Sequence, residues 1–101
     1  MNPFIVKIEP SKRKNKRFRV ILSNGDKYDF GLLGGSTYID HKDEKKRANY
    51  IARHLGNDKE SELIESLTPS PALFSLFLLW GYTSDLQENI KYLNDLLKNK
   101  K

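Results

Sequence analysis

Six positively charged residues lie within eight positions near the N-terminus, and no acidic residue lies among them. Lysine and arginine side chains neutralise phosphate groups and release counterions, which gives strong, salt-dependent binding with little information about base sequence. A lysine-rich loop also prevents edge-to-edge pairing between sheets, so a structural role is the alternative. We predict a mobile basic loop that contacts nucleic acid. The six residues are Lys12, Arg13, Lys14, Lys16, Arg17 and Arg19.

A second set of basic residues lies in a segment with helical periodicity, between residues 40 and 55. At ~100° per residue, Lys42, Lys46 and Arg53 share one exposed side of such a helix. A row of this kind can lie along a phosphate backbone. We therefore predict these three residues as a second contact with nucleic acid.

The adjoining side of the same helix carries polar and aromatic residues. Asp43 and Arg47 are spaced for an ion pair, because side chains four positions apart meet on a helix. Tyr50 can stack on His54 for the same reason. The cluster predicts either a polar seam against a neighbouring glycine-rich segment or a site where a base stacks. With His41 from the start of the same segment, its members are His41, Asp43, Arg47, Tyr50 and His54.

The two histidines are the residues to consider for acid–base or metal chemistry, since the chain has no cysteine. His41 and His54 are thirteen positions apart, whereas a helical zinc site needs histidines four apart or cysteine partners. An acid–base pair would need paired carboxylates or a nucleophile, which the flanking sequence does not supply. The run from Gly34 to Thr37 lacks the spacing and the lysine of a phosphate-binding P-loop. We predict no enzymatic activity, no metal and no cofactor.

The elements that position these residues begin with three predicted strands. In the first, Phe4, Val6 and Ile8 alternate with the intervening residues, which is the period of a half-buried strand. The same alternation runs from Phe18 to Leu22, and a shorter strand runs from Tyr28 to Phe30. The basic run lies between the first two strands, so it is predicted to form a hairpin loop.

The turn between the second and third strands decides which face each side chain occupies. A two-residue loop at Asn24–Gly25 would pair Val20 with Asp29 and so place a charge on the apolar face. A three-residue loop, with Gly25 in the left-handed conformation, pairs Val20 with Tyr28 instead. We predict the second arrangement, a type I turn with a glycine bulge.

Three to four helices are predicted after the strands. The first runs from Asp40 to Leu55, with Asp40 or Asp43 as its N-cap and Gly56 as its stop. A short helix follows Asp58. The buried stripe predicted for the first helix consists of Ala48, Ile51, Ala52 and Leu55.

The next helix begins at Ser70-Pro71, where a cap is followed by proline at the first helical position, and ends at Gly81. It is apolar on nearly every side, so we predict that it lies at the centre of the core and buries Leu73 and Trp80. The last helix opens with a capping box at Ser84–Gln87. Lys98, Lys100 and Lys101 lie at its C-terminal end, where cations interact favourably with the helix dipole.

Length and composition indicate a single basic α+β domain over residues 1–101, with a small antiparallel sheet followed by helices. The net charge is +5, but residues 1–54 carry +7 and residues 55–101 carry −2. This asymmetry favours an anionic partner. There is no secretory signal and no apolar run of the ~20 residues that span a bilayer. We expect an intracellular or virion protein that is not secreted and does not contact a membrane.

Four short motifs resemble those of a family of small uncharacterised proteins encoded by nucleocytoplasmic large DNA viruses. They are Phe30-Gly31, Tyr38–Asp43, Tyr50–His54 and Trp80-Gly81. The resemblance covers about residues 17–97, and the acidic stretch between His54 and Pro69 departs from it. It implies a viral origin and a virion component, and it implies no activity.

Two hypotheses follow for the function. The first is a non-catalytic module that binds DNA or RNA through the basic loop and the basic helix face. The second is a virion- or capsid-associated component whose basic face docks on an acidic protein surface.

Overall fold

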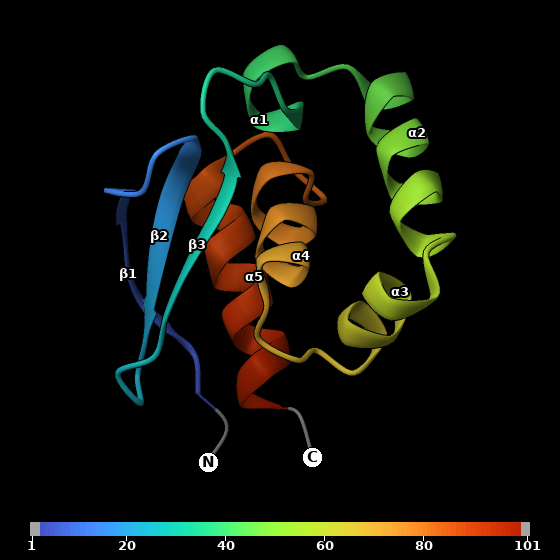
Figure 1. The fold of residues 1–101 in the computed structure, drawn as a ribbon. Coiled ribbons are helices and arrows are strands. Elements are labelled where there is room, and N and C mark those ends of the chain that lie inside the picture. The colour runs from blue at the N-terminus through green and yellow to red at the C-terminus, as the bar shows by residue number, and fades with distance from the viewer. Residues whose placement is uncertain (1–2, 100–101) are drawn as a thin grey trace.

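An antiparallel sheet of three strands is covered on one face by helices from the second half of the chain (Figure 1). This computed structural model describes residues 3–99, so the predicted positions of Lys100 and Lys101 lie outside it. The predicted α+β class, a small N-terminal sheet followed by helices, is confirmed. None of the helices in residues 3–99 is long and apolar enough to span a membrane.

The elements follow one another in a simple order, with the strands first. The sheet order is β1-β2-β3, so each strand pairs with its neighbour in sequence. The strands are β1 (Ile5–Pro10), β2 (Lys16–Leu22) and β3 (Lys27–Leu32), and the helices are α1 (Tyr38–His41), α2 (Glu44–Leu55), α3 (Asp58–Glu65), α4 (Pro71–Phe74), the π-helical turn η1 (Ser75–Leu79) and α5 (Leu86–Lys98).

The hairpin of β2 and β3 has the predicted register. Val20 pairs with Tyr28 and Phe18 pairs with Phe30. Gly25 has φ +91°, which is the left-handed conformation predicted for the three-residue loop. Val20 and Phe30 are fully buried, so the register that keeps charges out of the core is the one adopted.

The predicted face of the first strand is wrong at its N-terminal end. A bulge between Ile5 and Lys7 shifts the pairing of β1 with β2. The extra residue reverses the alternation, so Ile5 is buried while Val6 is 57% exposed. Beyond the bulge, Ile8 packs against the core as predicted.

The core lies between the sheet, the continuous helix α4–η1 and α5. Ser70 caps this helix through its hydroxyl, which accepts from the Leu73 N–H at 3.2 Å. Leu73 is buried as predicted, but Trp80 is only partly buried. We call the three strands, α4, η1 and α5 the two-layer body. Its buried residues are Ile5, Val20, Leu22, Phe30, Leu73, Phe74, Leu78, Leu79, Leu93 and Leu97.

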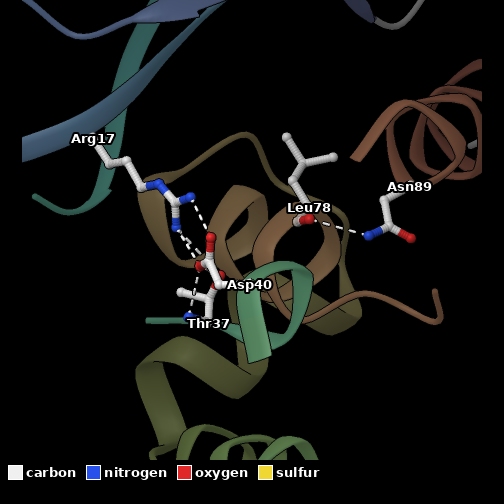
Figure 2. Close-up of polar contacts among 5 residues, drawn as sticks. All are labelled: Arg17, Thr37, Asp40, Leu78 and Asn89. Carbon is white, nitrogen blue, oxygen red and sulfur yellow. Dashed lines mark hydrogen bonds and ion pairs between the residues drawn. The ribbon is translucent and has the colours of Figure 1, made fainter. Parts of the chain in front are cut away.

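A buried amide closes the π-helical end of this core. The Asn89 side chain is fully buried and donates to the carbonyl oxygen of Leu78 at 3.1 Å (Figure 2). It also donates to the carbonyl of Thr83 at 2.9 Å and accepts from the Thr83 N–H at 3.2 Å. A Cβ at Gly81 would lie 2.6 Å from the Asn89 side chain, so only glycine fits at this end. No pattern in the sequence predicted that the Asn89 side chain would bind these carbonyl groups.

The last helix begins one residue later than predicted. Asp85, and not Ser84, is the N-cap, and its side chain accepts from the N–H groups of Gln87 and Glu88. At the other end, the Lys98 ammonium lies 4.6 Å from the centre of the Phe4 ring, just before β1.

The helix predicted from Asp40 to Leu55 is two helices. α1 ends at His41 with Lys42 as its C-cap at φ +57°, and α2 begins after a new N-cap at Asp43. The predicted buried stripe is also wrong, because none of residues 44–55 is buried and Leu55 is 42% exposed. The side of α2 that faces the body carries mainly aromatic and polar residues, and of the predicted stripe only Ile51 lies there, beside Arg47 and Leu76. We call α2 and α3 the outer helices, and Figure 1 shows them apart from the sheet, beyond α4.

Candidate functional site

The loop between β1 and β2 presents free positive charge. Lys12, Arg13 and Lys14 are exposed, and none of them has an ion-pair partner among residues 3–99. Asn15 follows in the left-handed conformation with φ +68°, and its carbonyl accepts from the Leu33 N–H at 3.1 Å. The predicted basic hairpin loop is therefore present, and its base lies beside the loop that follows β3.

The base of the hairpin is also held by hydrogen bonds to Asp29 of β3. The Ser11 hydroxyl donates to the Asp29 carboxylate at 2.6 Å, and the Arg19 Nε donates to it at 3.0 Å. The hydrogen bond from Arg19, followed by that from Ser11, lowers the pKa of Asp29. Arg19 is thus paired with Asp29 within the sheet.

Arg17 is also paired, and its partner lies in α1. Its two terminal nitrogens each donate to an oxygen of Asp40 at 2.7 Å (Figure 2). Asp40 accepts in addition from the backbone N–H of Thr37 at 2.8 Å and from its hydroxyl at 2.9 Å. The hydrogen bond from Arg17 is the largest cause that holds the pKa of Asp40 well below its usual range. Arg17 therefore fixes α1 to β2 and is not available to a phosphate.

The predicted polar cluster surrounds Trp80 as a succession of rings. His41 lies 5.2 Å from Trp80 between ring centres, and Tyr50 stacks on the indole at 4.2 Å with an interplanar angle of 7°. His54 follows at 4.0 Å from Tyr50, so the predicted stacking of these two residues is confirmed. The rings join α1, α2 and the end of η1.

The predicted pairing of Asp43 with Arg47 is wrong. The Asp43 carboxylate accepts from the N–H groups of Lys45 and Lys46, so it caps α2. The Arg47 Nε points the other way and donates to the carbonyl oxygens of Trp80 and Gly81, at 3.2 and 2.6 Å. Carbonyl groups at the end of a helix need donors, and this requirement outweighs an exposed ion pair.

At the two ends of the polar cluster, His41 and His54 make polar contacts. The Asp43 N–H donates to the His41 Nδ1 at 3.0 Å, while the His41 Nε2 is buried without a partner among the described residues. His54 Nδ1 and a Glu60 carboxylate oxygen form a close pair between α2 and α3. Burial, followed by the charge of Glu60, raises the pKa of Tyr50 to about 12, so its hydroxyl stays protonated at neutral pH.

A cavity of about 500 Å³ lies between the two-layer body and the outer helices. Tyr50, His54 and Glu60 line it from the outer helices, and α4 and η1 line it from the body. Lys16 and the loop after β3 complete it. The predicted seam between the polar cluster and the glycine-rich segment is thus an open space. Its lining residues are Asn15, Lys16, Gly31, Leu32, Gly35, Ser36, Thr37, Tyr50, His54, Glu60, Pro71, Ala72, Ser75, Leu79 and Trp80.

The predicted basic helix row is divided between two elements, because Lys42 is the C-cap of α1 while Lys46 and Arg53 lie on α2. Lys42, Lys46 and Arg53 are all exposed, as predicted. However, Figure 1 shows α2 on the opposite side of the molecule from the hairpin of β1 and β2, with α4 and α5 between them. In this view the body therefore separates the hairpin from α2, the helix that carries Lys46 and Arg53.

The part of the site that sequence analysis missed is the cavity. Glu60 and Ala72 belong to no motif, and their approach to the polar cluster depends on how α3 and α4 pack. Trp80 was recognised in a motif but was placed in the core. Within residues 3–99 no group of three or more histidine, aspartate and glutamate side chains is arranged to hold a metal ion.

Residues 6–54 match the model of a family of unknown function (DUF5754). The matched segment contains the basic hairpin and the polar cluster but ends before Glu60 and Trp80. No curated protein and no solved structure matches the chain. The resemblance to proteins of large DNA viruses stays a prediction.

Proposed function

We propose that the protein binds nucleic acid through the hairpin loop of β1 and β2. The observation that carries this proposal is the contrast within the basic run. Arg17 and Arg19 are paired with Asp40 and Asp29, whereas Lys12, Arg13 and Lys14 are exposed with no acidic partner in residues 3–99. Charges that are not needed for the fold are presented together at a loop tip.

The paired arginines hold the loop in place for this task. Arg19 with Asp29 ties the hairpin across the sheet, and Arg17 with Asp40 ties it to α1. With Lys16 at the start of β2, four cations are available to contact phosphates. Each phosphate neutralised on duplex DNA contributes about −0.9 to the slope of log affinity against log salt. Three to four contacts predict a slope of roughly −2.7 to −3.6.

The test compares two variants that lose the same charge. One replaces Lys12, Arg13 and Lys14 with serine. The control replaces Lys27, Lys59 and Lys91, which are also exposed but lie at the start of β3, in α3 and in α5. Binding to a short duplex DNA is measured by fluorescence anisotropy over a range of salt concentrations.

The hairpin variant should weaken binding to every duplex sequence and flatten the slope by roughly 2.7, the share of three phosphates. The control should keep the slope of the wild type. Equal slopes for all three proteins would contradict the proposal. Docking of the same charges on an acidic protein surface would then be the better hypothesis.

A further inference from the structure

We propose that the cavity between the two-layer body and the outer helices receives the base of an unpaired nucleotide, whose phosphate lies at Lys16. This inference rests on the proposed function and adds a ligand class to it. The cavity has a volume of about 500 Å³. Pockets for small molecules are usually ~300–1,000 Å³. Its mouth reaches the base of the basic hairpin, because Asn15 and Lys16 line it.

The apolar part of the lining suits a flat ring. Leu79, Pro71 and Ala72 contribute aliphatic surface from the body. On the other side, both faces of Tyr50 are covered, by Trp80 and by His54. Tyr50 therefore presents its ring edge to the cavity, and an aromatic ligand packs favourably edge-to-face against it.

The polar groups in the lining have free capacity for hydrogen bonds. One Glu60 oxygen pairs with His54, and the other has no hydrogen-bond partner among residues 3–99. The Ser36 hydroxyl is also without a partner within the described residues. A carboxylate accepts from the ring N–H and exocyclic amino groups of a base, as glutamate does with cytosine in DNA recognition.

The charges in the cavity exclude simpler ligands. A purely apolar molecule would remove water from the Glu60 carboxylate without replacing its hydrogen bonds, which is unfavourable. A small anion would be attracted by Lys16 but repelled by Glu60. A nucleotide satisfies both ends, since its phosphate is anionic while its base has N–H donors and apolar faces.

The nucleotide must be unpaired. In a duplex, the edge of each base is hydrogen-bonded to its partner and both faces are stacked, so a base enters a pocket only from single-stranded or flipped-out positions. A free mononucleotide and an unpaired position in a strand share this chemistry. The experiment below distinguishes these two sources.

The binding test uses three probes and one intrinsic reporter. The probes are an octamer of deoxyadenosine, an abasic octamer with the same phosphates, and AMP. Trp80 is the only tryptophan in the chain, so its fluorescence reports on the cavity. The adenine octamer should quench Trp80 and bind about 5-fold or more tightly than the abasic octamer, as one well-packed base requires. Quenching by AMP as well would assign a free nucleotide, and quenching by the octamer alone would assign a position in a strand.

Two variants fill the cavity. Ala72→Leu extends a side chain into it from α4, and Ser36→Leu does so from the loop after β3. Ala48→Leu is the matched control, because Ala48 is exposed on α2 and does not line the cavity. Circular dichroism establishes that each variant is folded. Ser36 is exposed in a loop, so its variant keeps the test valid if Ala72→Leu does not fold.

Both filling variants should lose the preference for the adenine octamer and keep the salt slope, while Ala48→Leu should keep both. Equal affinity of the wild type for the adenine and abasic octamers, with no quenching by any probe, would overturn this inference. That result would leave the hairpin proposal intact if the slope still depended on Lys12, Arg13 and Lys14. Loss of that dependence as well would overturn both.

Discussion

The two-layer body and the outer helices are held in place by different kinds of contact. In the body, aliphatic and phenyl side chains from the sheet, α4, η1 and α5 are fully buried against one another. By contrast, none of residues 44–55 in α2 is buried, and α3 buries only Ile64. The outer helices are attached to the body by stacked rings and by the hydrogen bonds of Arg47, while the pair of His54 with Glu60 joins α2 to α3.

This difference separates stability from binding. Apolar burial contributes most of the free energy of folding and has little directional preference. Stacked rings and hydrogen bonds contribute less but fix an orientation, and here they fix one wall of a cavity. Regions with few buried apolar contacts open with smaller free energies than the core, and binding sites are commonly found in them. The cavity lies at the boundary between the two regions.

The largest expected effect on stability comes from truncating a buried side chain of the two-layer body. Leu73→Ala should lower the free energy of unfolding by about 2–5 kcal/mol, because the side chain is fully buried. Leu55→Ala is the matched change in α2 and should cost less than about 0.5 kcal/mol, since Leu55 is exposed. Urea unfolding measures both. Similar losses in the two variants would break the distinction between the regions.

The next effect concerns the buried amide of the body. Asn89→Ala removes the donor to the carbonyl oxygens of Leu78 and Thr83, which then lack these partners. We expect a loss of about 2–3 kcal/mol, the range for a buried polar group left unsatisfied. The measurement is again urea unfolding. A loss below about 0.5 kcal/mol would show that the π-helical end does not depend on this side chain.

A smaller effect is expected where α2 joins the body. Arg47→Met keeps the aliphatic stem but removes the donor to the Trp80 and Gly81 carbonyls. We expect a loss of about 1–2 kcal/mol and a change in Trp80 fluorescence, because Tyr50 would no longer be held on the indole. Arg53→Met on the same helix is the control and should change neither, since Arg53 is exposed.

The smallest effect concerns Asp40, and it depends on pH. The folded-state pKa of Asp40 is lowered from its usual 3.8, chiefly by Arg17, so the pair stabilises the fold above about pH 4. This contribution is lost as the pH falls through the folded-state pKa. The pair is partly exposed, and Asp40→Asn should therefore cost at most about 1 kcal/mol at pH 7.

The difference in unfolding free energy between wild type and Asp40→Asn should then shrink as the pH is lowered from 4 towards 2. Asp29 is present in both proteins and contributes equally to their acid sensitivity. A difference that stays constant over this range would mean that the carboxylate charge is not the cause of the loss.

Strands and helices whose apolar residues recur with a regular period could be predicted from sequence. The β2–β3 register followed because the alternative places Asp29 against the core. The central helix could be predicted because Ser70-Pro71 marks its start and because it is apolar on nearly every side. The buried face of β1 could not be predicted, because the bulge at Val6 leaves no sign in the alternation of apolar residues.

The side of α2 that contacts the body was mispredicted for a physical reason. Two of the four residues in the predicted stripe are alanines, which bury little area, whereas Tyr50 can stack on Trp80 from the opposite side. The basic run was located correctly, but its composition does not reveal which charges are paired. Asp29 and Asp40 are distant in sequence from the arginines that they bind, so only the fold separates Arg17 and Arg19 from the free cations of the loop.

Hydrogen–deuterium exchange, with and without the adenine octamer, tests the central claim most directly. Without ligand, the amides of α2 and α3 should exchange faster than those of β2 and α5. With ligand, protection should increase in residues 11–16 and in α2, while β2 and α5 change little. Protection confined to α5 or to the β2–β3 turn, or an equally slow exchange of both regions in the free protein, would contradict the account.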